Sequence, residues 1–487
     1  MSASFFFYDL ETSGFSPQAA RIMQFAGQRT DLNLKPIGEP VNVLIKITPD
    51  ILPDPDAILL TGITPQKTIQ DGISEAEFLK LFYQEIAQPD TTFMGFNSIR
   101  FDDEFMRYLH YRNFYDAYEW QWKNGSSRWD LLDVVRMTRA LRPDGIEWPF
   151  APDGKPANRL EYLSKVNKLS HDNAHDALSD VQVTIDLARL IKNKQPDLFE
   201  YLRTHSGKKA TKELVLKQEP FVYTTGRYGS QFLNTSVAVL LVPHPEQDSG
   251  LVYDLRFDPT EFFDKSPAQL ADHWRFSKDP AHIALPVKTL KYNRCPTVAP
   301  LGVLNDAAQE RINLDLETVK KHLKLLRQHQ AKFASRVIAA LKILDDERSK
   351  TQTSLVDDER EVDTKLYESF FSDADKISMA MVRAAKPTEL GSLQLKGDVR
   401  LRQLLPLYHA RNYPDTLNDT ERRDWEEFCK YKLQSGEGSS RLARFAKRLQ
   451  ELDADPATTE AQRYILEELQ LYAESIIQLD STDTGEY

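Results

Sequence analysis

A run of aromatic residues near the N-terminus is the feature that most constrains how this chain folds. The stretch Ser4–Gly14 reads SFFFYDLETSG. Such a run, closed by Ser-Gly, predicts a buried strand that enters a turn. Because side chains alternate between the faces of a strand, Asp9 and Glu11 project on the same side. Buried carboxylates are costly unless a cation neutralises them, and Mg²⁺ prefers oxygen ligands. The alternative is an exposed strand end with two solvated acids.

Length and composition bound the class of protein. A chain of 487 residues suggests two to four domains, and 41% hydrophobic with 28% charged residues is typical of a soluble globular protein. No stretch approaches the roughly 20 apolar residues of a membrane span, and no basic region precedes the N-terminal apolar run, so we expect neither a membrane anchor nor a signal peptide. Two cysteines, Cys295 and Cys429, are too few for a disulfide framework and suit a reducing cytoplasm.

Hydrophobic periodicity divides the chain into three regions of different expected secondary structure. Strands are predicted over residues 4–11, 21–30, 41–47 and 91–96, and helices over 74–87, around 105–109, and over 129–141, 160–166 and 176–192. Strands followed by interleaved helices predict an α/β domain that ends near residue 195. Short apolar segments within 220–300, broken by Pro, Gly and Asn, indicate a small β barrel or sandwich. The pattern is helical from 311 and again from 366, with a polar candidate linker over 345–361.

Two further acidic clusters follow the first. Asp102 lies at the junction between the strand at 91–96 and the next helix, where an N-cap role is the alternative. His175 precedes the helix at 176–192, and Asp180 lies in its first turns. The alternatives there are an exposed loop imidazole and a surface acid near a helix N-terminus. Each cluster alone is a weak signal, but three clusters in matching structural contexts indicate one shared site.

These clusters resemble the three motifs of the DEDDh exonuclease family. The motifs are Asp-x-Glu on the first strand, Phe-Asp-x-x-Phe after a later strand, and His-x₄-Asp at a helix start, and the resemblance covers residues 4–192. The spacer from Asn97 to Asp102 is one residue longer than in many relatives. This departure leaves Asp103 as an alternative ligand.

Segments 111–116, 127–134, 140–146 and 370–376 extend the resemblance to the bacterial exonuclease I family over essentially the whole chain. It implies a DEDDh nuclease domain of the RNase H-like α/β class (4–195), an SH3-like β domain with accessory helices (196–350) and a C-terminal all-α domain (355–487). It also implies processive 3′→5′ degradation of single-stranded DNA to 5′-mononucleotides, in DNA repair and recombination.

The resemblance implies a catalytic set of five residues. Asp9, Glu11, Asp102 and Asp180 would hold two Mg²⁺ ions, for which Mn²⁺ can substitute, and His175 would be the general base. An imidazole with an ordinary pKa near 6.5 suits proton transfer at neutral pH. Two ions about 3.5–4 Å apart can generate hydroxide, neutralise the phosphate and stabilise the leaving oxygen. Because four carboxylates repel one another, we expect the second ion and the substrate to bind interdependently.

Contacts to DNA and to a protein partner are also expected. By resemblance, Glu11 touches the terminal nucleotide and Arg159 a phosphate, although a surface arginine is the alternative for Arg159. Thr12, Phe15 and Trp129 are candidate base or sugar contacts, with core packing as the alternative for the aromatic residues. Candidate backbone contacts are Lys208, Lys209, Lys212, Arg227, Lys288 and Arg294.

The family also implies a partner, the acidic, Phe-ended tail of single-stranded-DNA-binding protein. Arg142 and Tyr201 are the candidates for its basic rim and apolar notch. The net charge of −11 argues against broad non-specific binding to nucleic acid but leaves room for a local basic channel. We expect a cytoplasmic monomer that joins the nucleoid when it is on DNA.

Two other functions remain open from the residues. The first is a DEDDh exoribonuclease or a proofreading-type exonuclease, which the long remainder of the chain beyond the nuclease domain disfavours. The second is a non-catalytic single-strand-binding scaffold on a relict fold. It is disfavoured because a relict has no physical reason to keep five clustered catalytic positions.

Overall fold

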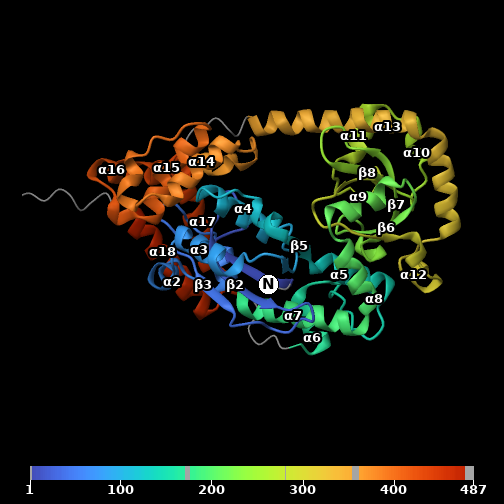
Figure 1. Ribbon diagram of the computed structural model, residues 1–487, viewed down its shortest axis with the longest axis horizontal. Coiled ribbons are helices and arrows are strands. Elements are labelled where there is room, and N and C mark those ends of the chain that lie inside the picture. Colours follow the sequence, from blue (N-terminus) through green and yellow to red (C-terminus); the bar gives the residue numbers. More distant parts are fainter. Residues whose placement is uncertain (1–2, 170–175, 280, 354–360, 478–487) are drawn as a thin grey trace, which may run out of the picture. The chain divides into compact units, whose positions relative to one another are not determined.

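The computed structural model describes residues 3–169, 176–279, 281–353 and 361–477 (Figure 1). The chain forms two compact units. The first comprises Met1–Ser127, Asp172–Gln182 and Asp358–Tyr487, and the second comprises Arg128–His171 and Val183–Asp357. Among the described residues, no helix combines the length and apolar character that crossing a bilayer requires.

A five-stranded mixed sheet organises the α/β part of the chain. Its order is β3-β2-β1-β4-β5, with β1 antiparallel to β2 and parallel to β4. The strands are β1 (Ser4–Thr12), β2 (Ile22–Thr30), β3 (Val41–Leu44), β4 (Thr91–Gly95) and β5 (Ser127–Asp130). Because β1 and β4 run in parallel, their carboxyl ends meet at one edge of the sheet, where polar side chains following the strands converge.

The α/β part of the first unit also contains helices. They are α1 (Pro55–Thr61), α2 (Pro65–Asp71), α3 (Glu75–Leu81), α4 (Asp102–Arg112) and the start of α7 (Ala177–Lys194). The helix predicted from residue 74 begins with a capping box between Ser74 and Glu77, and it continues past α3 as a π-helical turn (Phe82–Ile86). One face of β1, with Phe6 and Tyr8, lies in an aromatic core with helix α4.

The C-terminal helices share a hydrophobic core with the α/β part of the first unit. They are α14 (Asp373–Ala384), α15 (Val399–Asn412), α16 (Asp419–Gln434), α17 (Arg441–Asp453) and α18 (Glu460–Ile477), preceded by the 3₁₀ turn η6 (Val362–Tyr367). Tyr108 and Tyr111 of α4 pack in one cluster with Leu401 and Leu404 of α15. The first unit is therefore stabilised by apolar contacts between segments far apart in the sequence.

The second unit contains a five-stranded antiparallel sheet of order β10-β6-β7-β8-β9. Its strands are β6 (Phe221–Thr224), β7 (Thr235–Pro243), β8 (Ser249–Asp254), β9 (Val287–Lys291) and β10 (Thr297–Pro300). Its helices are α5 (Leu131–Leu141), α6 (Leu160–Asn167), the rest of α7, α8 (Pro196–His205), α9 (Lys208–Leu216), α10 (Thr260–Phe263), α11 (Pro267–Trp274), α12 (Asp306–Arg311) and α13 (Leu316–Thr353). The small β domain expected over 220–300 is thus confirmed.

Two sequence-based boundaries need correction. The linker expected over 345–361 is wrong for 345–353, because α13 continues to Thr353. Charged residues extend this helix with ion pairs three residues apart, such as Arg348 with Asp345 at 3.1 Å. Residues 354–360 lie outside the described residues. The helix expected from residue 129 begins at Leu131, since Asp130 is its N-cap and accepts a hydrogen bond from the Leu132 amide.

Candidate active site

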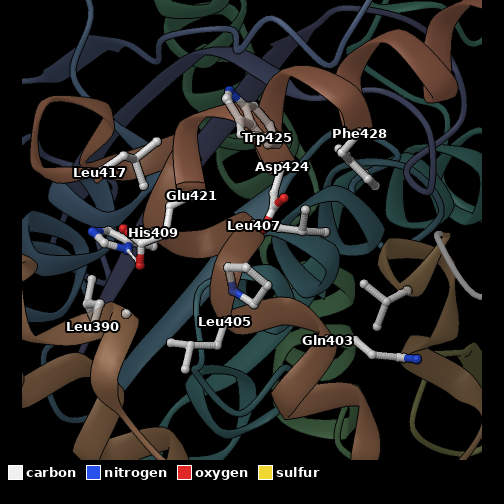
Figure 2. A pocket seen from close by; sticks show the side chains of 13 residues that line it. Leu390, Gln403, Leu405, Leu407, His409, Leu417, Glu421, Asp424, Trp425 and Phe428 are labelled. Atoms are coloured by element: carbon white, nitrogen blue, oxygen red, sulfur yellow. Dashed lines mark ion pairs between the residues drawn. The ribbon is translucent and has the colours of Figure 1, made fainter. Parts of the chain in front are cut away.

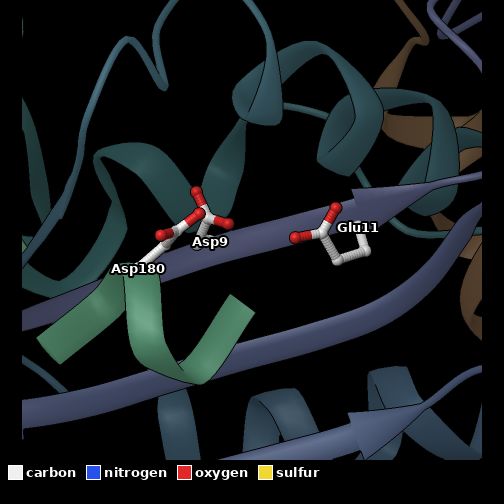
Figure 3. Close-up of side chains that lie close together, drawn as sticks. All are labelled: Asp9, Glu11 and Asp180. Atoms are coloured by element: carbon white, nitrogen blue, oxygen red, sulfur yellow. The ribbon is translucent and has the colours of Figure 1, made fainter. Parts of the chain in front are cut away.

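Three carboxylates meet at the carboxyl end of β1. Asp9 and Glu11 project from the same face of the strand, and Asp180 reaches them from the first turn of α7 (Figure 3). Oxygen atoms of the three side chains lie within 4.8 Å of one another. This confirms that two of the three predicted acidic clusters converge in space.

The electrostatics of the cluster favour a bound cation. Burial, and secondarily the charge of Asp180, raise the pKa of Asp9 well above its ordinary range. Burial, followed by the charges of Asp9, Asp180 and Asp176, raises the pKa of Glu11 to about 9. Crowded carboxylates cannot all ionise without a compensating charge. An all-oxygen donor set of this kind fits a hard divalent cation such as Mg²⁺ or Mn²⁺.

Asp102 and its neighbour Asp103 play different structural roles. Asp102 is the first residue of α4 and is 4% exposed, but it lies outside the cluster of three described carboxylates. Asp103 accepts a hydrogen bond from the Tyr8 hydroxyl at 2.5 Å, on the aromatic face of β1. Since strand side chains alternate, Tyr8 and Asp9 lie on opposite faces. The geometry therefore favours Asp102 over Asp103 as the additional ligand.

Backbone hydrogen bonds fix the loop that follows Glu11. The Ser13 amide donates to the Arg21 carbonyl and the Arg21 amide donates to Ser13 Oγ, both at 2.8 Å. The Ser13 carbonyl accepts from the Asp54 amide at 2.7 Å. The hydroxyl of Thr12 donates to the Gly14 carbonyl at 2.8 Å. Arg21 and Ser13 were missed by sequence reasoning, because nothing local marks residues that act by holding a strand end.

The aromatic and arginine candidates for DNA contacts have different environments. Phe15, in the first unit, is 63% exposed, as a stacking side chain requires. Trp129, in the second unit, is 2% exposed and packs edge-on against Phe199 at 5.1 Å, so the core-packing alternative is favoured and its assignment as a base contact is corrected. Arg159 is an exposed residue at the N-cap of α6, with its guanidinium 5.9 Å from the Tyr162 ring.

The remaining candidates lie in the second unit or outside the described residues. Arg142 donates to the carbonyls of Leu141 and Val303, and Tyr201 stacks on His205 at 4.2 Å. His175 lies outside the described residues. Among the basic candidates, Lys208 and Lys212 both pair with Asp248, and Arg227 donates to the Thr289 carbonyl. Burial lowers the pKa of Lys288.

A pocket among the C-terminal helices differs from the acidic cluster in its lining. Its volume is about 460 Å³, and α15 and α16 form most of its wall (Figure 2). Leu405, Leu407, Trp425 and Phe428 make it largely apolar. It contains none of the residues of the acidic cluster, so it is not a candidate site for phosphodiester chemistry.

A cluster of buried and half-buried carboxylates at the carboxyl end of a central strand, in a mixed sheet with flanking helices, defines an RNase H-like exonuclease domain. The family model described as Exonuclease matches residues 6–188. The models described as Exonuclease I SH3-like domain and Exonuclease I C-terminal domain match residues 206–342 and 360–476. The chain therefore belongs to the exonuclease I family.

Known relatives agree with this assignment over nearly the full chain. Exodeoxyribonuclease I of Haemophilus influenzae is 40% identical over 439 residues, which cover 88% of this chain and 91% of the relative. That of Escherichia coli is 37% identical and covers 98% of each chain. The exonuclease I structure from Methylocaldum szegediense and that of the E. coli enzyme with a dA16 oligonucleotide both superpose with a TM-score of 0.89. They are 38% and 37% identical, and each comparison covers 98% of this chain and 100% of the other.

Proposed function

We propose that this protein is an exodeoxyribonuclease that degrades single-stranded DNA processively in the 3′→5′ direction and releases 5′-mononucleotides. The carrying observation is the convergence of Asp9, Glu11 and Asp180 in a chain of the exonuclease I family. The E. coli relative has been solved with single-stranded oligonucleotides, which supports the same substrate here. We place its cellular role in DNA repair and recombination.

The proposed metal site consists of Asp9, Glu11, Asp102 and Asp180, holding two Mg²⁺ ions, with Mn²⁺ able to substitute. When bound, such ions supply charge neutralisation at the phosphate and an activated water. An acidic cluster of three oxygen donors supports this assignment.

The protein groups supply orientation and proton transfer. Glu11 contacts the terminal nucleotide and orients it, with Thr12 beside it. His175 takes the proton of the attacking water, as a general base with an ordinary pKa near 6.5 does at neutral pH. Arg159 donates to a phosphate oxygen, and its exposed guanidinium supports this role.

The domain organisation and partner follow the family. We propose a nuclease domain over 4–195, an SH3-like domain over 196–350 and a helical domain over 355–487, which the three family-model ranges support. One solved relative is described as an SSB/exonuclease I complex with an inhibitor. We propose that Arg142 and Tyr201 receive the acidic tail of single-stranded-DNA-binding protein. The protein acts as a monomer in the cytoplasm, at the nucleoid.

The test uses a 5′-labelled single strand and its duplex, with Mg²⁺ or EDTA, beside an Asp180→Ala variant. We expect a Mg²⁺-dependent ladder that shortens from the 3′ end of the single strand only. Asp180→Ala should abolish the ladder. The matched control is Asp186→Ala, because Asp186 lies on the same helix but pairs with Arg189. Binding without shortening under every metal condition would contradict the enzymatic function and favour a non-catalytic single-strand-binding scaffold. Equal shortening of RNA would favour an exoribonuclease.

A further inference from the structure

A buried hydrogen bond joins the strand and the helix that carry the proposed metal ligands. The Tyr8 hydroxyl donates to Asp103 Oδ1 at 2.5 Å, across 95 residues of sequence. Tyr8 directly precedes Asp9 on β1, and Asp103 directly follows Asp102 on α4. The bond therefore lies one residue away from a ligand on each side, on the face of β1 opposite to Asp9.

The hydroxyl group of Tyr8 has a fixed position. The ring is 3% exposed and lies among three aromatic side chains. Phe25 is stacked on it at 5.9 Å, and Phe93 and Trp120 meet it edge-on at 6.4 Å each. A ring held on several sides in a close-packed core cannot adjust its position without strain. The packing of the Tyr8 ring therefore fixes its hydroxyl, a hydrogen-bond donor, beside α4.

The start of α4 lacks the usual means of fixing a helix N-terminus. Its N-cap residue, Phe101, has φ −124° and ψ −75° and offers no side-chain cap. The first turn is instead held by the Asp103 amide, which donates to the Ser98 carbonyl at 2.9 Å, and by the Asp103 carboxylate on Tyr8. The carboxylate is 1% exposed, so losing the Tyr8 hydroxyl would leave a buried acceptor without that donor.

The end of β4, directly before the loop that leads to α4, is also close to both that loop and β1. A Cβ atom placed on Gly95 would come within 2.7 Å of Ser98 Cβ and 3.0 Å of the Tyr8 carbonyl oxygen. Only a glycine permits this approach without displacing backbone. Tyr8 therefore meets the start of α4 through its side chain and the end of β4 through its main chain.

We propose that Tyr8 is a positioning residue for the metal site. Its hydroxyl, acting through Asp103, fixes the start of α4, and with it Asp102, relative to Asp9 on β1. This rests on the proposed function, and Tyr8 itself touches neither the cation nor the DNA. Groups that orient metal ligands from behind typically change metal affinity by about 10–100-fold when they are removed.

The test is Tyr8→Phe, which keeps the ring and removes only the hydroxyl. Mn²⁺ binding to the DNA-free protein is measured by titration calorimetry, and the Mg²⁺ dependence of single-strand degradation is measured in parallel. We expect the dissociation constant for Mn²⁺ and the half-saturating Mg²⁺ concentration each to rise about tenfold. The rate at saturating Mg²⁺ should fall much less, because excess cation compensates for a loosened ligand.

Tyr111→Phe is the matched control. Tyr111 also lies on α4 and loses a buried hydroxyl that donates to the Val362 carbonyl at 2.9 Å, but it is far along the helix from Asp102. Its metal affinity should equal that of the wild type. Asp103→Asn keeps an acceptor for Tyr8 and should also bind Mn²⁺ normally. A tenfold loss in Asp103→Asn alone would instead make Asp103 a ligand and overturn the proposal.

Different outcomes would contradict the proposed function and the positioning role of Tyr8. A wild-type protein that binds Mn²⁺ but degrades no single strand would contradict the proposed function. A wild-type protein that degrades single strands, with Tyr8→Phe binding Mn²⁺ as tightly as Tyr111→Phe, would contradict the positioning role alone. If Tyr8→Phe does not fold, Asp103→Leu removes the acceptor while filling its space, and the same tenfold loss is required of it.

Discussion

Arg21 and Asp363 lie 342 residues apart in the sequence and form a buried ion pair, with Arg21 Nη2 3.0 Å from Asp363 Oδ2. Their side chains are 3% and 8% exposed. Arg21 is also the residue whose backbone holds Ser13, two positions beyond Glu11. Arg21 therefore connects Asp363 of η6, in the C-terminal part of the chain, to the residue that follows β1.

The ion pair belongs to a buried network. Arg411 donates to both oxygens of Asp363, at 2.9 and 2.6 Å, and to Asp50 at 2.8 Å, and Lys432 lies 2.6 Å from Asp50. Burial alone would raise the pKa of Asp363, but Arg411, Arg21 and Lys432 hold it well below its ordinary range. The network joins the residue before β2, the loop before α1, η6, α15 and α16 within the first unit.

Asp363→Asn is therefore expected to destabilise the protein by about 3–5 kcal/mol, because it removes one of the two central carboxylates that neutralise the buried Arg21, Arg411 and Lys432. The measurement is urea denaturation of the intact chain. Asp56→Asn is the control, since the Asp56–Arg448 pair is 43% exposed on each side and should cost less than about 1 kcal/mol. Equal losses in the two variants would show that the buried network contributes no more than a surface pair.

His110 predicts a pH-dependent stability. Burial lowers its pKa from 6.5 to about 4, while Asp116 and Arg383 act in opposite directions. Nδ1 lies 2.6 Å from the Met106 carbonyl oxygen, and Nε2 has no hydrogen-bond partner among the described residues. Between these pKa values the unfolded chain binds a proton that the folded chain excludes, so stability falls as the pH drops from 6.5 to about 4.

The expected size of that fall is about 3 kcal/mol, from 1.36 kcal/mol per pKa unit. Denaturation curves at several pH values, for wild type and His110→Phe, measure it. Other acids titrate in the same range in both proteins, so the informative quantity is the difference between the two curves. That difference should change across this window and be flat above pH 7. A difference that is constant from pH 4 to 7 would mean that folding does not lower the pKa of His110.

Metal binding should release protons. Glu11, with a pKa of about 9, is largely protonated at neutral pH without a cation, and a metal must displace that proton. Affinity for Mn²⁺ should therefore rise with pH until about 9. Calorimetry in buffers of different ionisation enthalpy counts the protons. Asp180→Asn removes one of the charges that raise the pKa of Glu11, so it should bind more weakly and release fewer protons. Affinity independent of pH between 6 and 8 would contradict the crowding of these carboxylates.

Sequence reasoning succeeded where the signal was local. The aromatic run, the spacing of Asp9 and Glu11, and the helix expected from residue 74 each depend on residues close together in the sequence, and the structure confirms each of them. The sequence did not predict the Tyr8–Asp103 hydrogen bond or the Arg21–Asp363 ion pair, because these residues come together only in the tertiary fold. The prediction that Trp129 contacts a base or sugar was wrong for a related reason. Whether an aromatic side chain stacks on a base or packs in the core, as Trp129 does against Phe199, depends on burial, which the sequence does not encode locally.

Gly95 tests how closely the end of β4 must approach β1 and the loop before α4. Gly95→Ala would place a methyl group against Ser98 and the Tyr8 carbonyl, and because one of these contacts is backbone it cannot be relieved by a side-chain rotation. Overpacking of this kind costs about 1–3 kcal/mol. It should also shift Asp102, so Mn²⁺ affinity and the unfolding free energy should fall together. Gly302→Ala, where an added Cβ meets nothing within 4 Å, should leave both unchanged. If Gly95→Ala lost stability but kept full metal affinity, the position of Asp102 would not depend on this loop, and the Tyr8–Asp103 bond alone would have to account for it.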